Sequence, residues 1–504
     1  MMIHHTIKKQ IINSRYNSFM ILLLVGLIVT SSTMLVSGTG LASDINCEYD
    51  SAGRLIRVDY GNGQGVIYTY DAAGNILSVE RGPLPATPTP VPTVTPTPTP
   101  TGGAVHQVPG DFPNIQAAVN AAVSGDTILV SEGTFSGSGN TSINFMGKNL
   151  VVQGDENRGT TILDCGNTAR AFIFQNGESS AALVRNLTII NAQDAGHGGA
   201  ILCSGSAPTI ENCVFENCQT TGNEGGAIRC EASSGMTISN CMFRNNSATG
   251  IFYGGGGAIS IEESSNVTIN DSEFYDNISQ GTQNGGAVRV DENGQLTMSD
   301  CILTANFSAG VGAGLQVGET GTADLVNCYF SANRNNGSSG AAIASSLGGM
   351  VTAANCVFKN NEAAGGSPGG AIVVTQNATA IIVNSLFADN VDTQGYGVHS
   401  YGTLQLIHCR MIGDGVSVTG GNCDLLNCLI SDNISSDNGG AVQVSGSGTL
   451  LNVSNCTLAG NDCPDSNGKG IYCGNGSVAT IENSIVWNSG TGTSEIYDGG
   501  AQSI

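Results

Sequence analysis

Three acidic residues recur at matching places of a repeated phrase, and two arginines accompany them. Glu231, Glu262 and Asp291 each stand six residues after the first glycine of a Gly-Gly-Ala segment, with Arg229 and Arg289 two residues before the first and the last of them. If the repeats stack, these carboxylates lie about 5 Å apart. Carboxylates that close share a proton, as an acid/base pair does, or bind a hard cation such as Ca²⁺. The five residues are therefore the catalytic candidates, and the three acids are the candidate calcium ligands.

The same interleaving of arginine and acid has a plainer interpretation, which we favour. Opposite charges that alternate on a solvated sheet face neutralise one another, and carboxylate clusters mark functional sites only statistically. This interpretation predicts an exposed acidic row, bracketed by Arg229 and Arg289, whose replacement by alanine leaves the fold intact.

An internal repeat must position these residues. The first glycine of each copy stands at 198, 225, 256, 285, 312, 340, 369, 395, 413, 439 and 468. A second landmark keeps the same period: Asn186, Asn212, Asn240, Asp271, Asp300, Asn327, Asn355, Asn384, His408, Asn427, Asn455 and Asn483. Two landmarks in phase, with a period of about 27 residues, indicate a repeat architecture.

Within a copy the apolar residues alternate, as in Ala258-Ile-Ser-Ile261 and Ala287-Val-Arg-Val290. Alternation is the period of a strand with one buried face, and the intervening glycines and asparagines suit turns. The pattern predicts a solenoid with about three strands per coil, in which equivalent strands pair in parallel and in register. Arg229, Ser260, Arg289 and Gln316 then share one outward column, and Glu231, Glu262 and Asp291 the next.

Two further columns have structural interpretations. The asparagine column fits a turn residue that tolerates the left-handed region and passes side-chain hydrogen bonds from coil to coil. The next residue is a small one that we expect to be buried: Cys213, Cys241, Ser272, Cys301, Cys328, Cys356, Ser385, Cys409, Cys428, Cys456 and Ser484.

The alternation of Gly-Gly-Ala-Ile with Phe-x-x-Asn, as in Phe243 to Asn246 and Phe274 to Asn277, resembles the repeats of polymorphic outer-membrane proteins. Those and related bacterial proteins share the right-handed parallel β-helix of the pectin-lyase-like fold. The resemblance covers about residues 105–504 and implies an all-β fold of this kind. It does not imply one activity, because the fold carries lyases, hydrolases, adhesins and structural proteins.

Two functions follow from the resemblance. The first is a secreted or cell-surface protein without catalysis, which contacts a polysaccharide or cell-surface glycan in adhesion. The second is a pectate-lyase-like enzyme, in which calcium acidifies the α-proton of a uronate and arginine acts as base, or a retaining glycosidase. We favour the first, because the tandem Asp pairs with a nearby His that lyases and polygalacturonases of this fold carry are absent.

Composition and the N-terminal sequence limit the partners and the cellular location that we expect. A formal charge of -23 argues against nucleic acid or anionic lipid as partner. Residues 1–42 have the pattern of a cleaved signal peptide, with Lys8, Lys9 and Arg15 before an apolar run; an uncleaved anchor is the alternative. We expect a secreted or surface protein with no membrane span once the signal is removed.

The segment 43–82 carries a different repeat. Tyr49-Asp-Ser-Ala-Gly-Arg-Leu55 and Tyr70-Asp-Ala-Ala-Gly-Asn-Ile76 resemble the YD repeats of Rhs and teneurin-like surface proteins. Two copies predict a small hairpin module with strands at 55–60 and 65–70. The Pro/Thr-rich stretch 83–103 favours polyproline II and predicts an extended linker to the β-helix at 104–504.

Further expectations concern the solenoid's ends and its cysteines. Residues 113–123 place Ile115, Ala118, Val119 and Ala122 on one helical face, which predicts a helix capping the first coil. At the other end we expect an open last coil, either because the sequence is a piece of a longer protein or because a protein partner covers this coil. We expect most cysteines to be packing thiols, with Cys463–Cys473 and Cys203–Cys230 as the better disulfide candidates.

Overall fold

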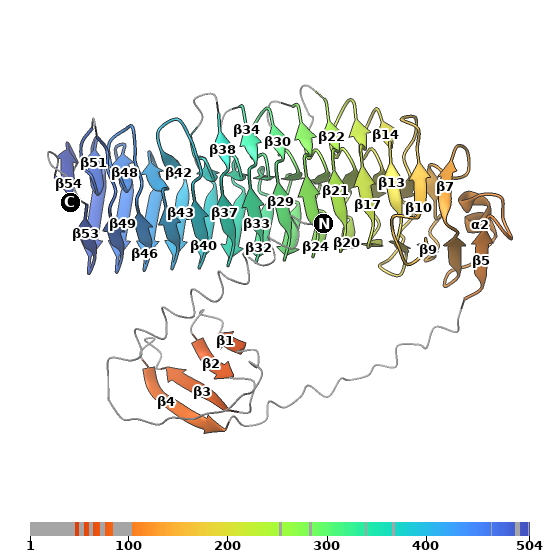
Figure 1. The fold of residues 1–504 in the computed structure, drawn as a ribbon, viewed down its shortest axis with the longest axis horizontal. Helices are drawn as coiled ribbons and strands as arrows, with labels where there is room; N and C mark the ends of the chain where they lie inside the picture. The colour runs from red at the N-terminus through yellow and green to blue at the C-terminus, as the bar shows by residue number, and fades with distance from the viewer. Residues whose placement is uncertain are drawn as a thin grey trace. The chain divides into compact units, whose positions relative to one another are not determined.

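The computed structural model divides the chain into two compact units, residues 1–97 and 98–504 (Figure 1). It describes the four strands between residues 46 and 83. It also describes residues 103–503, except 251–254, 282–284, 338–339, 365–367, 465, 489–493 and 502. The predicted signal peptide and most of the predicted linker lie outside these residues.

The first unit contains one antiparallel sheet in the order β1-β2-β3-β4. Its strands are β1 (Asn46–Tyr49), β2 (Leu55–Asp59), β3 (Gln64–Tyr70) and β4 (Ile76–Pro83). The strands predicted at 55–60 and 65–70 correspond to β2 and β3. The module is a four-stranded meander, larger than the predicted hairpin.

The second unit is an all-β parallel solenoid, as predicted. One coil runs through β15 (Ile201–Ser204), β16 (Thr209–Glu211), β17 (Val214–Glu216) and the short β18 (Gln219–Thr220) before the next coil begins at β19 (Ile228–Glu231). Each strand pairs in parallel with its equivalent in the next coil, so the coils stack into four sheets (Figure 1). We number the sheets I to IV.

Sheet I has 15 strands. They are β5 (Val105–Val108), β6 (Thr127–Val130), β9 (Val151–Gln153), β12 (Leu183–Arg185), β16, β20 (Gly235–Ser239), β24 (Asn266–Asn270), β28 (Gln295–Ser299), β32 (Thr322–Val326), β36 (Met350–Ala354), β40 (Thr379–Val383), β43 (Thr403–Ile407), β46 (Asn422–Leu426), β49 (Leu450–Ser454) and β52 (Val478–Glu482).

Sheet II has 14 strands. They are β7 (Gly133–Ser136), β10 (Thr161–Asp164), β13 (Thr188–Ile190), β17, β21 (Met242–Arg244), β25 (Glu273–Tyr275), β29 (Ile302–Thr304), β33 (Tyr329–Ser331), β37 (Val357–Lys359), β41 (Leu386–Ala388), β44 (Arg410–Ile412), β47 (Leu429–Ser431), β50 (Thr457–Ala459) and β53 (Ile485–Trp487).

Sheet III also has 14 strands and carries the predicted site residues. They are β8 (Ile143–Asn144), β11 (Phe172–Phe174), β15, β19, β23 (Ile259–Ile261), β27 (Val288–Val290), β31 (Leu315–Val317), β35 (Ile343–Ser345), β39 (Ile372–Val374), β42 (Tyr396–Ser400), β45 (Gly415–Val418), β48 (Val442–Ser445), β51 (Ile471–Gly474) and β54 (Ile496–Gly499).

Sheet IV, with seven strands of two residues each, is an addition to the three strands per coil that the sequence predicts. They are β14 (Gln193–Asp194), β18, β22 (Ser247–Ala248), β26 (Ile278–Ser279), β30 (Phe307–Ser308), β34 (Arg334–Asn335) and β38 (Glu362–Ala363). A two-residue strand is too short to show an alternating pattern, so the sequence carries no signal for it.

The core consists of columns of equivalent residues from successive coils. Phe215, Phe243 and Phe274 stack with ring centroids 4.8 Å apart, and a second stack joins Phe330, Phe358 and Phe387. The described cysteines of the predicted packing column are buried, and Ser272 and Ser385 occupy the same place. These columns are the result of strict register, since the same position always points inward.

The predicted asparagine column lies at the turn between sheets I and II. All twelve residues have positive φ, from 48° at Asn483 to 60° at Asn186. Side chains join neighbouring coils, as in Asn240 Nδ2 to Asn212 Oδ1 at 3.0 Å and Asn384 Nδ2 to Asn355 Oδ1 at 2.6 Å. Both parts of the prediction are confirmed.

A second asparagine ladder runs inside the solenoid. Its members are Asn246, Asn277, Asn306, Asn333, Asn361 and Asn390, at most 3% exposed. Each Nδ2 donates to the side-chain oxygen of the next, at 2.8–3.0 Å, and the last donates to Asp414. These residues include the asparagines of the Phe-x-x-Asn motif, and their role is to satisfy polar groups in the interior.

The helix α2 (Ile115–Ala121) covers the first coil, as predicted. Asn114 caps its N-terminus by accepting a hydrogen bond from the Ala117 N–H at 2.8 Å. Ile115, Ala118 and Val119 are fully buried. The helix therefore shields the apolar end of the core from water.

The two disulfide candidates are wrong, since Cys203, Cys230, Cys463 and Cys473 are free thiols. Cys203 and Cys230 are register partners on β15 and β19. Neighbouring parallel strands point such Cβ bonds the same way, which is a poor approach for a disulfide. Among the described residues, no helix is long and apolar enough to cross a membrane.

Candidate functional site

The candidate site lies on the outward face of sheet III, on strands β19, β23 and β27. Arg229 pairs in register with Ser260, and Ser260 with Arg289. The alternate residues Ile228 and Cys230 are fully buried in the core, which turns Arg229 and Glu231 outward. The predicted outward columns are confirmed.

The five predicted residues come together in one ion-pair cluster. Glu262 Oε1 lies 2.8 Å from Arg229 Nη1 and 2.9 Å from Arg289 Nη1, so this carboxylate bridges both guanidiniums. Arg289 Nη2 donates to Asp291 Oδ2 at 2.6 Å. Glu231 Oε2 lies 3.4 Å from Arg229 Nε, within ion-pair range but without hydrogen-bond geometry.

Glu224 is a member of the cluster that the sequence analysis missed. It lies on the segment between β18 and β19, and its carboxylate contacts the Nη1 atoms of both Arg229 and Arg289. It stands directly before the Gly-Gly pair of its copy, where the neighbouring copies have His197 and Gly255. An acidic residue at a position where the neighbouring copies have none is the feature of the sequence that could have indicated the role of Glu224.

The expectation of an exposed acidic row is wrong. Arg229, Glu262 and Asp291 are each 3% exposed, and Glu231 is half-buried. The guanidiniums of Arg229 and Arg289 pair with Glu262 and Glu224, so the charged groups shield one another from water. A buried ion pair that loses one partner leaves an uncompensated charge, so these side chains also matter for the fold.

Burial and the charges of neighbouring groups give the carboxyl groups of the cluster different pKa values. Burial, then the neighbouring Glu262 charge, raises the pKa of Glu224 to about 7, and burial raises the pKa of Asp291 to about 6. Burial also works to raise the pKa of Glu262, but the guanidiniums of Arg289 and Arg229 hold it below its ordinary value. Near neutral pH the Glu224 carboxyl is therefore partly protonated beside an ionised Glu262.

A line of unsatisfied polar atoms extends along the same face. Among the described residues, the buried side-chain atoms without a hydrogen-bond partner are Nδ1 of His197 and His399, Nε of Arg229 and Arg289, and Oε1 of Gln316. Arg229, Arg289, Gln316 and His399 belong to one in-register column of sheet III. His197 directly precedes the Gly-Gly pair of the β15 coil. Buried polar atoms are normally paired, so this line marks where a partner is missing.

The predicted calcium site at Glu231, Glu262 and Asp291 stays a prediction. In the described part of the chain, no group of three or more His, Cys, Asp or Glu side chains is placed to hold a metal ion. The guanidiniums of Arg229 and Arg289 pair with the carboxylates that the ion would need.

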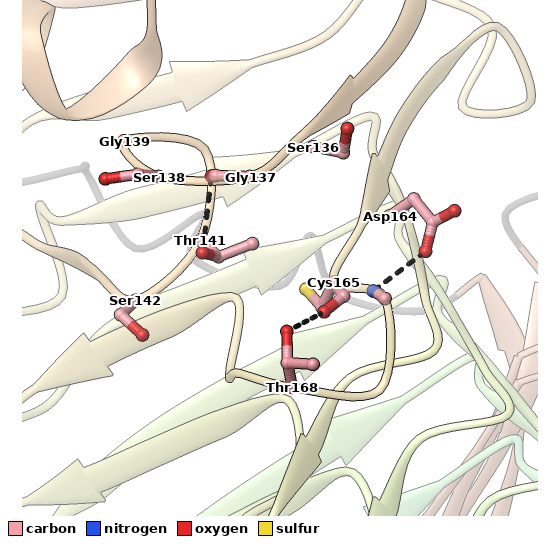
Figure 2. A pocket seen from close by; sticks show the side chains of 10 residues that line it. Ser136, Gly137, Ser138, Gly139, Thr141, Ser142, Asp164, Cys165 and Thr168 are labelled. Atoms are coloured by element: carbon pink, nitrogen blue, oxygen red, sulfur yellow. Dashed lines mark hydrogen bonds between the residues drawn. The ribbon is translucent and has the colours of Figure 1, made fainter.

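A polar hollow of about 640 Å³ lies elsewhere, at the N-terminal coils (Figure 2). Ser136, Ser138, Thr141, Ser142 and Thr168 line it with hydroxyl groups. Asp164 Oδ1 accepts a hydrogen bond from the Gly166 N–H at 3.0 Å. Apart from the Cys165 thiol, Asp164 is the one titratable side chain in its lining, so the hollow offers no acid/base pair.

Two family models match the chain. The model described as right handed beta helix region matches residues 112–264, 171–337 and 252–387, and that of the RHS repeat matches residues 49–83. Together the three beta-helix matches span more than half of the chain. No curated protein matches it.

Several solved structures are similar at low identity. The catalytic unit of the thermostable GH87 alpha-1,3-glucanase from Streptomyces thermodiastaticus strain HF3-3 is 14% identical, covering 77% of this chain and 71% of that one, with a TM-score of 0.44. The A-module of the Azotobacter vinelandii mannuronan C-5 epimerase AlgE6 is 13% identical, covering 78% and 99%, with a TM-score of 0.28. The Yersinia enterocolitica family 28 exopolygalacturonase is 12% identical, covering 86% and 82%, with a TM-score of 0.23. Likenesses this weak do not assign an activity.

Proposed function

Because this chain belongs to the right-handed β-helix family, we propose that it is a secreted or cell-surface protein whose sheet III contacts a glycan without catalysis. The observation that carries the proposal is the line of buried, unpartnered polar atoms along the outward face. A fold of this type presents in-register rows of side chains, and such rows suit an extended, repeating ligand.

The chemistry of the unpartnered atoms favours a polyhydroxylated chain. Nε of Arg229 and of Arg289 are donors, whereas Oε1 of Gln316 is an acceptor. A hydroxyl group both donates and accepts, so one kind of ligand group satisfies both kinds of atom. From Arg229 on β19 to Gln316 on β31 the unpartnered atoms cross three strand spacings, about 14 Å, and Ala344 and Val373 separate them from His399 on β42. That length suits a glycan of several sugars.

The arrangement of the carboxylates argues for binding over catalysis. Glu262 is shared by two guanidiniums, and Asp291 is paired with Arg289. A general acid or base must come within hydrogen-bond reach of the proton it transfers. Carboxylates that are engaged with guanidiniums are poorly placed to do so.

Surface display is part of the proposal. The RHS repeat match at 49–83 supports the resemblance to YD-repeat surface proteins, and the formal charge of -23 suits a soluble protein outside the cell. Membership of the polymorphic outer-membrane protein group is a finer proposal of the same kind, which the Phe-x-x-Asn motif supports.

A second function has one observation in its favour. The pKa of Glu224, at about 7, and the lowered pKa of Glu262 differ as those of a general acid and its partner base do. A polysaccharide lyase or glycoside hydrolase that uses this pair is the alternative.

The test is a glycan array probed with the full-length chain, together with assays for new reducing ends and unsaturated products with and without calcium. We expect binding without product. Gln316→Ala should weaken binding, whereas Gln295→Ala, on the exposed face of sheet I, should not. Absence of any bound glycan would refute the proposal. Product formation that Glu224→Gln abolishes would establish the enzyme instead.

A further inference from the structure

The acidic character of this face extends beyond the ion-pair cluster. In three successive coils an exposed glutamate stands at the turn that follows the sheet III strand: Glu263, Glu292 and Glu319. The turns are joined backbone to backbone, since Ser264 N donates to Glu292 O at 3.0 Å and Asn293 N to Glu319 O at 3.2 Å. The three glutamates therefore form a row beside the cluster.

The charges of this part of the face do not balance. Seven carboxyl groups gather there, of Glu224, Glu231, Glu262, Glu263, Asp291, Glu292 and Glu319. The guanidiniums that pair with the cluster are those of Arg229 and Arg289. Burial, and after it the charge of Glu262, raises the pKa of Glu292. A bound cation would relieve this repulsion.

An independent observation points to the same kind of ligand. Gln316 is 2% exposed, and its Oε1 is an acceptor without a donor. The residue between Gln316 and the acids is Gly318, where an added Cβ would stand 2.5 Å from Gln316 Nε2 and 3.3 Å from Asp291 Oδ1. The donor end of the Gln316 amide, Nε2, therefore lies on the side of the Asp291 carboxylate, and the unpartnered Oε1 is the other end of the same amide. An ammonium group supplies the N–H that Oε1 needs and the positive charge that the acids need.

We propose that the glycan bound by sheet III is an amino-sugar polymer of the glucosamine type, with free ammonium groups. This inference rests on the proposed glycan-contact function. The ammonium groups pair with the acidic row and Gln316 Oε1, and the hydroxyl oxygens accept from the Nε atoms of Arg229 and Arg289. A polyuronate is disfavoured on this face by like charge, since its carboxylates would face the ionised carboxylates of the acidic row and the cluster.

A sugar chain fits this surface better than a lysine-rich peptide. A peptide that adds to a sheet pairs its backbone with an open strand edge. Here the backbone groups of β19, β23 and β27 are already paired with the strands on both sides. The face therefore recognises its ligand through side chains.

The experiment is calorimetric titration of the full-length protein with four short ligands of equal length. They are a glucosamine hexamer, its N-acetylated form, a galacturonate hexamer and hexalysine. We expect the glucosamine hexamer to bind, roughly tenfold more tightly than the N-acetylated form. We expect this binding to weaken as NaCl rises from about 0.05 to about 0.5 M, and the galacturonate hexamer not to bind.

Two double variants with the same change in net charge locate the effect. Glu292→Gln with Glu319→Gln alters exposed side chains beside the site and should weaken glucosamine binding roughly fivefold. Glu132→Gln with Glu482→Gln, exposed on distant coils, should leave it unchanged. Equal losses in both doubles would overturn the assignment to this face.

The ligand series separates this inference from the function on which it rests. Equal affinity for the glucosamine and N-acetylated hexamers would refute the need for ammonium and leave glycan contact standing. Binding of neither sugar would refute the amino-sugar inference, and the glycan array then decides whether glycan contact stands. Binding of hexalysine as tight as that of the glucosamine hexamer would replace the sugar by a basic peptide.

Discussion

The carboxylate of Glu224 contacts the guanidinium of Arg289, which lies two strands further along sheet III. A residue from the segment before β19 thus ties three successive coils together, because the same carboxylate also contacts Arg229 in its own coil. Loss of this contact is the basis of the first prediction.

Glu224→Gln should flatten the dependence of stability on pH. The pKa of Glu224 rises from an ordinary 4.5 to about 7 in the folded protein. Its contribution to stability is therefore fully present below about pH 4.5 and is lost as the pH rises through about 7. Urea unfolding of the wild type should show a falling midpoint between about pH 5 and about pH 8. The variant should be less sensitive, with a residual slope from Asp291 and Asp414; parallel profiles would contradict the prediction.

Glu262→Ala should destabilise the solenoid, whereas its neighbour Glu263→Ala should not. Removing Glu262 leaves Arg229 and Arg289 short of a buried partner, at a cost of about 3–5 kcal/mol. Glu263 is exposed, and its replacement should stay within about 0.5 kcal/mol. The free energies of unfolding in urea measure both effects. If the two variants were equally stable, Glu262 would behave as an exposed residue, as the sequence predicts.

Asp414→Asn should stabilise the protein near neutral pH. Asp414 is fully buried at the end of the inner ladder, where it accepts hydrogen bonds from Asn390 N and Nδ2, both at 3.0 Å. Burial raises its pKa to about 8, from an ordinary 3.8. Its contribution to stability is lost as the pH rises through about 8, and asparagine removes this loss.

We expect a gain of about 1 kcal/mol at pH 8 for Asp414→Asn and none at about pH 4. Asp389→Asn, on the exposed turn, is the matched control and should change little. A variant that is less stable than the wild type at pH 8 would show that the charged form is required.

The ladder thiols should resist alkylation in the folded protein. Cys213, Cys241, Cys328 and Cys356 are at most 2% exposed, and the described cysteines are free. Burial raises the pKa of Cys213, so little thiolate forms there, whereas hydrogen bonds from Cys301 and Cys356 lower the pKa of Cys328, which is protected by its burial alone. Peptide mapping after iodoacetamide treatment should find these residues unmodified until urea is added, and a reductant should leave the melting temperature unchanged. Fast labelling of Cys241 in the native state would show that the core opens locally.

Much of the fold could be predicted from the sequence because a parallel solenoid repeats one local rule. The alternation around Ile228 and Ile259 assigns inside and outside, and register then aligns every equivalent residue. The outward column from Arg229 to Gln316 could therefore be predicted residue by residue. The positive φ of Asn240 and its neighbours follows from the same period, since asparagine tolerates that conformation.

Exposure could not be predicted in this way. Alternation says that Glu262 points away from the core, but not what lies over it. Glu224 comes from an irregular segment between β18 and β19, and segments of this kind vary in length and sequence from copy to copy. Periodicity carries no information about them. For the same reason the unpartnered atoms of Gln316 and His399 became visible only in the structure.

The replacement of asparagine by Asp414 in the inner ladder affects how the solenoid unfolds under a mechanical force. In a stacked array each coil contacts only its neighbours, so stability is a sum of coil and interface contributions and unfolding starts at the weakest interface. Six buried amides run without interruption from Asn246 to Asn390, and the chain of amides stops where Asn390 meets a carboxyl group. Because ionisation of the buried Asp414 destabilises the fold, a pulling force along the axis should part the solenoid at this coil first above about pH 8, leaving the N-terminal block intact.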